Sequence, residues 1–273
     1  MNRTLSSKES QLILNLEWHK RKFITVDDIV DILKCRESYA RKIAHILTKK
    51  KWLERIGRGK YLLISAERGI NPVVPEMNPY MIVKSLSEPY YFSYRVSSFQ
   101  YGLITQVPNV IHVVLLRQRP STKWKNVEFH FVSVSRHKFF GWQKIKLFGE
   151  EVNMADMEKT VLDCLDREDL SGGIEEVTRV IFYASRQLNW KKLMDYAILM
   201  NSGTICRRLG FLLNLLKIPM PKKFERFLSR YVKKDKAFLA SPKRWGKKGE
   251  WNMKWNLIKN VSEKELYSEI RIE

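Results

Sequence analysis

Basic, hydroxyl and aromatic side chains gather between residues 36 and 45, and their combined chemistry is that of a polyanion-binding surface. Arginine and lysine pair with phosphate oxygens, while serine, tyrosine and histidine can hydrogen-bond to phosphates or to base edges. A second basic group follows shortly afterwards along the chain. The candidate contact residues of the two groups are Arg36, Ser38, Tyr39, Arg41, Lys42, His45, Arg55, Arg58 and Lys60.

An acidic constellation offers a different chemistry. Asp163, Asp166 and Asp169 recur at three-residue steps, and carboxylates so spaced could hold a divalent cation in a nucleic-acid-processing enzyme. The alternative is a solvated helix end with turn-forming aspartates before Gly172-Gly173, which we favour because no further ligand motif accompanies them. We therefore assign no metal, no cofactor and no catalytic residue, and we expect a protein that is not an enzyme.

Motifs of other chemistries are missing from the sequence. The chain contains no HExxH, no GxSxG and no GxGxxG. The three cysteines lie far apart and form no CxxC pair, so we expect reduced and mostly buried thiols. His112 and His130 fall in expected strands, where a packed or hydrogen-bonded role is more common than a catalytic one.

Three helices and a hairpin are expected to position the basic residues. The first helix follows a capping box that begins at Ser6, and the second follows Thr25, whose hydroxyl can cap it. The third helix is expected over 36–50, with an apolar face opposite the basic one. Two short strands rich in β-forming residues then flank Gly57-Arg58-Gly59, which predicts a β-hairpin.

This order of elements is that of a winged helix-turn-helix. In that arrangement the third helix lies in the major groove of DNA, and the hairpin, or wing, meets phosphates. The alternative is a small helical domain whose basic face is merely solvated or binds a protein. We favour DNA because the basic residues coincide with the two elements that dock in this motif.

The length indicates about two domains, and the charge is compatible with RNA, DNA or an acidic membrane as a partner, among which charge alone does not choose. The 273 residues suggest about two domains, and the formal net charge is +21. Residues 1–66 and 221–273 each carry +8, residues 67–150 carry +6, and residues 151–220 carry −1. The excess charge is therefore spread over several segments, which excludes a single solvated basic tail.

A proline-containing linker is expected at 67–80, between a winged helix-turn-helix domain at 1–66 and a second domain at 81–273. Short helices and continuous or alternating apolar strands come first in the second domain, and helical periodicity dominates from residue 154 onward. The predicted fold class is thus α+β, with a small sheet and a helical C-terminal half following the winged helix-turn-helix.

The last fifty residues combine tryptophans with lysines and arginines. Trp245, Trp251 and Trp255 could stack on bases as a second nucleic-acid surface, in which case RNA binding is an alternative function. We slightly favour the opposite interpretation, in which the tryptophans fold back onto the second domain. No apolar run approaches the ~20 residues of a membrane-spanning helix, and the first residues lack a signal peptide, so we expect a cytoplasmic protein without a membrane partner.

Several runs in the second domain resemble the AbiEi family of antitoxins and transcriptional regulators, over roughly residues 20 to 255. The features that carry the resemblance are a helix ending in Tyr101-Gly102-Leu103-Ile104, Thr105-Gln106 before a strand, Ala155 with Glu158-Lys159 and Leu162-Asp163, the Gly172-Gly173 turn, Arg208-Leu209-Gly210 and a tryptophan-containing end.

This resemblance implies an N-terminal winged helix that binds inverted repeats in the protein's own promoter and represses it, with two or more copies on the DNA. It also implies a C-terminal antitoxin domain that counteracts a nucleotidyltransferase toxin in a type IV toxin-antitoxin system. Such pairs act in abortive infection, a form of antiviral defence. The expected partners are therefore double-stranded DNA with an inverted-repeat operator and, functionally, a nucleotidyltransferase toxin.

Overall fold

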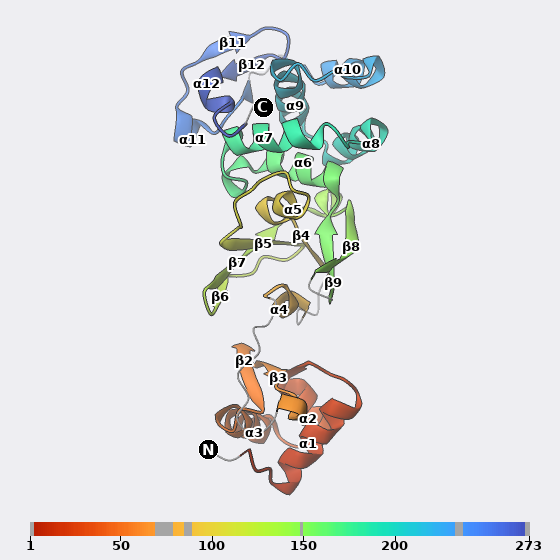
Figure 1. Ribbon diagram of the computed structural model, residues 1–273, viewed down its shortest axis with the longest axis vertical. Helices are drawn as coiled ribbons and strands as arrows, with labels where there is room; N and C mark the ends of the chain where they lie inside the picture. Colours follow the sequence, from red (N-terminus) through yellow and green to blue (C-terminus); the bar gives the residue numbers. More distant parts are fainter. Residues whose placement is uncertain (1–2, 69–78, 85–88, 148–149, 233–236, 271–273) are drawn as a thin grey trace. The chain divides into compact units, whose positions relative to one another are not determined.

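The chain divides into two compact units, residues 1–87 and 88–273, and each is described here by itself (Figure 1). Helices and strands occur in both units, which confirms the predicted α+β class. Most of the expected linker, at 69–78, lies outside the described residues. The computed structural model describes residues 3–68, 79–84, 89–147, 150–232 and 237–270.

Three helices and a three-stranded sheet form the body of the first unit. The sheet has the order β1-β3-β2, and both pairings are antiparallel. The short helices η1 and α4 follow the sheet. The elements in chain order are α1 (Ser7–Trp18), β1 (Phe23–Thr25), α2 (Val26–Leu33), α3 (Glu37–Lys49), β2 (Leu53–Gly57), β3 (Lys60–Leu63), η1 (Ala66–Arg68) and α4 (Tyr80–Lys84).

Local hydrogen bonds set the ends of the first two helices. The Glu9 carboxylate accepts a hydrogen bond from the Ser6 backbone at 2.8 Å, and the Thr25 hydroxyl accepts one from the Asp28 backbone at 3.1 Å. Lys34 ends α2 in the left-handed region, with φ of 48°, and so turns the chain into α3. The capping predicted at Ser6 and Thr25 is confirmed.

The hairpin is tighter than the sequence suggested. Gly57 pairs with Lys60, so the turn has two residues, Arg58 and Gly59, instead of three. Gly59 has φ of +68°, a conformation that glycine adopts without the steric cost of a side chain. A register shift between Arg55 and Gly57 marks an irregularity in β2 just before this turn.

A six-stranded mixed sheet begins the second unit, with the order β6-β7-β5-β4-β9-β8. β4 runs parallel to β9 and antiparallel to β5, while β5 and β7 are parallel. The sequence did not predict β4 or β9. The strands, with the one helix that interrupts them before β5, are β4 (Tyr90–Phe92), α5 (Arg95–Gln100), β5 (Val110–Leu115), β6 (Thr122–Trp124), β7 (Val127–Ser133), β8 (Trp142–Leu147) and β9 (Glu150–Ala155).

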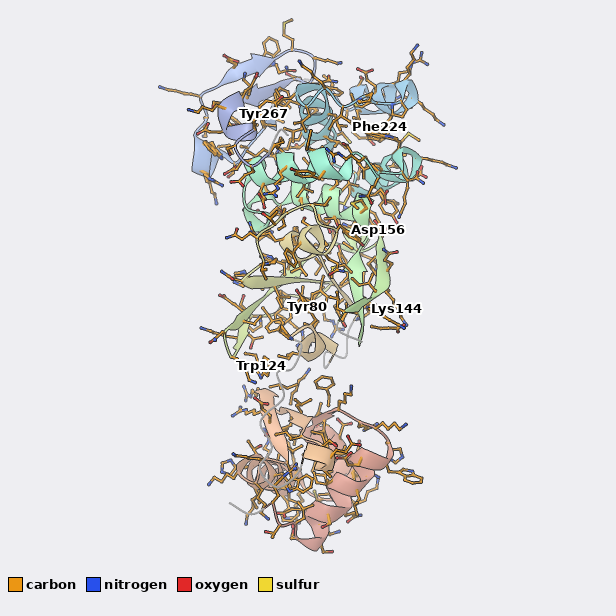
Figure 2. All side chains as sticks on the ribbon, in the orientation of Figure 1. Tyr80, Trp124, Lys144, Asp156, Phe224 and Tyr267 are labelled. Carbon is orange, nitrogen blue, oxygen red and sulfur yellow. The ribbon has the colours of Figure 1, made fainter. Side chains whose placement is uncertain are left out.

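Helix α6 (Met157–Asp166) lies at the centre of the second unit, where it contacts α5, α7, α8 and α9 (Figure 1). All residues from Glu158 to Leu165 are buried, so neighbours surround this helix over two turns. Asp156, labelled in Figure 2, caps its N-terminus by accepting a hydrogen bond from the Lys159 backbone at 2.9 Å. The helices that follow are α7 (Ile174–Ala184), α8 (Trp190–Met200), α9 (Gly203–Leu215) and α10 (Lys222–Ser229).

The second unit also contains a three-stranded sheet within residues 237–259, which was not predicted. Its strands are β10 (Ala237–Phe238), β11 (Glu250–Asn252) and β12 (Leu257–Lys259), in the order β10-β12-β11, and the short helices α11 (Pro242–Trp245) and α12 (Glu263–Leu266) flank them. Within the described residues, no helix is both long enough and apolar enough to cross a bilayer.

The indole of Trp255 anchors this C-terminal sheet to α9. Its side chain is 1% exposed, and its Nε1 donates a hydrogen bond to Asn214 Oδ1 at 3.0 Å. The ring lies directly over Gly210, where an added Cβ would come within 2.3 Å of it. The glycine therefore makes room for the indole.

We expect Gly210→Ala to lower the free energy of unfolding of the second unit by about 1–3 kcal/mol, because its Cβ overlaps the Trp255 ring. Gly203→Ala on the same helix is the matched control. A Cβ there would lie 3.6 Å from its nearest neighbour, so that variant gains helix propensity without a clash. Guanidinium unfolding measures both, and equal stability of the two variants would contradict this account of the packing.

Candidate nucleic-acid interface

A polar and basic stripe runs along the exposed side of α3. Ala40, Ile43, Ala44 and Leu47 are buried, which confirms the predicted apolar face. At 100° per residue the opposite side of the helix carries four exposed side chains, and three of them were predicted as contact residues. The four residues of this stripe are Ser38, Lys42, His45 and Lys49.

Other predicted contact residues flank the stripe. Arg36 is exposed at the N-cap of α3, and the Tyr39 ring is 43% exposed in the first turn. Arg41 is also exposed, and its Nε donates a hydrogen bond to Glu37 Oε1 at 3.0 Å. Glu37 is the only carboxylate within α3, so this exposed pair orients the guanidinium while neutralising part of its charge.

The hairpin carries the second predicted group. Arg55 and Arg58 are exposed, whereas Lys60 is half-buried where β3 begins. The Arg55 Nε donates to the Gly57 carbonyl at 3.2 Å, which holds this side chain along its own strand. Exposed arginines on a hairpin can contact phosphates without distortion of the turn.

Trp52 connects α3 to the hairpin. Its backbone N–H donates to the Leu47 carbonyl at 2.9 Å, and its carbonyl accepts from Ile64 at 2.9 Å. The Arg3 guanidinium stacks over its indole at 3.7 Å from the ring centroid. The backbone of Trp52 thus joins the end of α3 to the residue after β3, while its side chain is buried.

Two carboxylates elsewhere in the first unit are held ionised. Burial opposes the charge on Glu9, but hydrogen bonds from Lys50 and Ser6 outweigh it and lower the Glu9 pKa. Burial likewise opposes ionisation of Asp28, and hydrogen bonds from Thr25 together with the charge of Arg21 lower its pKa.

The acidic constellation of the second unit is not a metal site in the described part of the chain. Asp163 forms an ion pair with Lys159, and Asp166 accepts a hydrogen bond from Lys138 Nζ at 2.6 Å. Asp169 accepts two hydrogen bonds from the Arg167 guanidinium, from Nε at 2.9 Å and from Nη2 at 2.7 Å. Each carboxylate thus has its own cation. Among the described residues, no three His, Cys, Asp or Glu side chains are grouped to hold a metal ion.

Lys159 and Asp163 form an ion pair at the centre of the second unit, with side chains that are 0% and 4% exposed. Ser93 Oγ donates to Asp163 Oδ2 at 2.7 Å, and the Lys159 ammonium lies 3.6 Å from Met200 Sδ. Burial raises the pKa of the Asp163 carboxyl, and the charge of Lys159 opposes that rise. The pair is inaccessible to a substrate and has the character of a core ion pair.

His112 and His130 lie on the neighbouring strands β5 and β7, as the sequence indicated. Their ring centroids are 5.7 Å apart in an edge-to-face contact, and His130 Nε2 lies 2.9 Å from Glu128 Oε1. His112 is 5% exposed, and its Nδ1 has no hydrogen-bond partner among the described residues. Burial lowers the pKa of His112 to about 4, helped by the positive charges of His130 and Arg95.

The three C-terminal tryptophans differ in burial, so neither interpretation applies to all of them. Trp255 is buried and Trp245 packs partly against the core, as expected of a tail that folds back. Trp251 is 54% exposed, although its Nε1 donates to Asn256 Oδ1 at 3.0 Å. The packing interpretation therefore applies to two of the three indoles, and one stays accessible on β11.

Comparison with known proteins gives a fold and no function. No protein-family model matches the chain, and no curated protein matches it. Among solved structures, it is similar to the RV2827C protein from Mycobacterium tuberculosis, with a TM-score of 0.62 and 12% sequence identity over 94% of this chain and 92% of that chain. The similarity spans most of both chains, so the two proteins share a fold.

We expect Asp163→Ala to lower the free energy of unfolding of the second unit by about 3–5 kcal/mol, because it leaves the Lys159 ammonium buried without its carboxylate. Asp169→Ala, which removes a half-exposed partner of Arg167, is the control and should cost about 0–1 kcal/mol. Guanidinium unfolding gives both values. A rise in melting temperature with Mg²⁺ that Asp163→Ala abolishes would instead restore the metal-site alternative.

The stability of the second unit should also fall as the pH drops from 6.5 to about 4. His112 binds its proton more weakly in the folded chain than in the unfolded one, so its contribution is complete above 6.5 and is lost toward the folded pKa of about 4. The loss amounts to about 3 kcal/mol at most. Unfolding free energies across this pH range test it, and His112→Gln, which does not titrate, should lack the step.

Proposed function

We propose that this protein is a DNA-binding transcriptional regulator whose first unit is a winged helix-turn-helix. The observation that carries the proposal is the coincidence of exposed basic side chains with α3 and with the β2–β3 hairpin. In a winged helix-turn-helix these two elements are the recognition helix and the wing. The proposed contact residues are Arg36, Ser38, Tyr39, Arg41, Lys42, His45, Arg55, Arg58 and Lys60.

The roles of these residues follow from their positions. Lys42 and His45 project from the side of α3 opposite its buried face and would reach base edges in the major groove. Arg55 and Arg58 at the hairpin would contact phosphates and position the unit without reading sequence. Two copies on an inverted repeat would place their third helices one helical turn apart along the DNA, as the dimers of this motif do.

We further propose that the chain is an AbiEi-type antitoxin that represses its own operon in the cytoplasm and counteracts a nucleotidyltransferase toxin. The support is the sequence resemblance carried by Tyr101–Ile104, the Gly172-Gly173 turn and Arg208–Gly210. A gene for a nucleotidyltransferase beside the gene for this chain would be the most direct further support. The alternative of a metal-dependent nuclease loses its main argument, since each aspartate of its constellation already pairs with a cation.

We expect the double substitution Arg41→Ala/Lys42→Ala to weaken binding to the chain's own promoter DNA by about ten- to a hundredfold, because it removes two cations from the proposed recognition helix. Gel shift and fluorescence anisotropy at several salt concentrations measure the effect. The logarithm of the affinity should fall linearly with the logarithm of salt concentration, and less steeply for the variant.

Lys8→Ala/Lys20→Ala is the matched control, because it removes the same charge from exposed positions outside α3 and the hairpin. Its affinity should stay near that of the unmodified protein. An equal loss in both double variants would reduce the interaction to diffuse charge attraction. Unchanged affinity of Arg41→Ala/Lys42→Ala would contradict the assignment of α3 as the recognition helix.

A further inference from the structure

A groove that the proposed function does not use lies in the second unit, between strands β5 and β7 and the turn that follows α6. It consists of two adjoining hollows of about 450 and 440 Å³, which share His130 and Leu170 as common wall. Each hollow has the volume of a small-molecule site. We call them the first hollow, which contains Arg95, and the second hollow, which contains Arg119.

The groove is electropositive. Three guanidinium groups line it, those of Arg95, Arg119 and Arg167, against the single carboxylate of Asp169. His112, in the wall of the first hollow, responds to this field, since burial first and then the charges of His130 and Arg95 lower its pKa. A concave surface with such an excess of positive charge attracts an anion.

Two of its three arginines, Arg95 and Arg167, are held in place by neighbouring side chains. Arg95 Nη2 donates to Gln106 Oε1 at 2.7 Å, and an added Cβ at Gly172 would lie 2.5 Å from Arg95 Nη1. The guanidinium therefore rests against a glycine, whose φ of +92° also favours that residue type. Arg167 is held by its two hydrogen bonds to Asp169. Preorganised charges of this kind lose little entropy on binding.

The two hollows differ in chemistry. Val107, Val110 and Leu170 give the first hollow apolar walls, and the amides of Gln106 and Asn109 add polar groups to it. The second hollow combines Arg119 and Arg167 with the hydroxyls of Ser121 and Ser133. Guanidinium and hydroxyl groups together suit a phosphate, while apolar walls with amides suit a flat heterocycle.

We propose that this groove binds a nucleotide, with its phosphate in the second hollow between Arg119 and Arg167 and its base in the first hollow beside Gln106 and Asn109. The His130 imidazole, at the junction of the two, is placed to stack on the base or the sugar. The site lies wholly in the second unit and does not depend on DNA binding by α3.

Isothermal titration calorimetry on the full chain tests the proposal, with inorganic phosphate, the four ribonucleoside 5′-monophosphates and the corresponding nucleosides as probes. We expect at least one monophosphate to bind saturably and more tightly than both inorganic phosphate and its own nucleoside, because only the nucleotide fills both hollows. Arg41→Ala/Lys42→Ala should bind the same nucleotide unchanged, so a failure of this proposal and a failure of DNA binding are distinguishable.

Arg167→Gln should weaken nucleotide binding by about tenfold, since it removes a charge-assisted hydrogen bond to the phosphate. Arg230→Gln, at an exposed position after α10, is its matched control and should leave the affinity unchanged. Val107→Trp should fill the first hollow, and because the Val107 side chain is 64% exposed, the larger ring should not unfold the chain. The nucleotide should then bind no more tightly than inorganic phosphate. Leu199→Trp, which adds the same ring at a 49% exposed position of α8 outside the groove, is the control, and the nucleotide should still bind to it more tightly than inorganic phosphate.

Three outcomes would overturn the proposal. One is the absence of saturable binding for every monophosphate at millimolar concentration. Another is nucleotide binding that survives both Arg167→Gln and Val107→Trp. The third is Arg167-dependent binding of a single-stranded oligonucleotide without binding of any mononucleotide, which would assign the groove to a nucleic-acid strand instead. Should Arg167→Gln fail to fold, Val107→Trp and its Leu199→Trp control still decide between these results.

Discussion

The second unit is organised around one buried charge pair, the ammonium of Lys159 and the carboxylate of Asp163. Two charges at 0% and 4% exposure are tolerated only when their remaining hydrogen-bonding capacity is met. Ser93 supplies a hydroxyl next to β4, and Met200 at the end of α8 lies against the ammonium. The pair therefore requires a sheet strand, α6 and α8 to be in place together.

Polar contacts also join the N-terminal end of α6 to α8. Lys192 of α8 reaches Asp156 at 3.2 Å and Glu158 at 3.0 Å, and Tyr196 donates to Asp156 at 2.9 Å. The carboxylates of Asp156, which caps α6, and of Glu158, in its first turn, thus contact the Lys192 ammonium, and Asp156 also accepts from the Tyr196 hydroxyl. Because these contacts are polar and directional, they fix the rotation of α6 as well as its position.

The amphipathic helices were predictable because their signals are local. Ser6 and Thr25 lie within one turn of the groups they cap, and Ala40, Ile43 and Leu47 repeat at helical spacing. The strand β4 has only three residues, and its partners β5 and β9 lie farther along the chain. The strand β9 instead pairs over six residues with its neighbour β8 and meets β4 at a single residue pair. In β9 the alternating pattern is short and runs directly into the helical period that begins at residue 154, so the sequence alone does not separate this strand from α6. The sequence did not predict the C-terminal sheet because β10 has only two residues and its partner β12 lies beyond α11 and β11.

The exposed basic face of α3 was predictable from the sequence because a helix face is a periodic property, whereas the electropositive groove was not. Arg95 and Arg119 belong to the segment 67–150, and Arg167 belongs to the segment 151–220, whose net charge is −1. That neutral segment holds many acidic side chains, but several of them pair with cations from elsewhere, as Asp166 does with Lys138 and Glu175 with Arg244. The net charge of a segment therefore does not show which of its charged side chains are paired in the folded protein and which line a common surface. Arg167 is an example. It forms an ion pair with Asp169, and it also lines the groove together with Arg95 and Arg119, which lie far from it in the sequence.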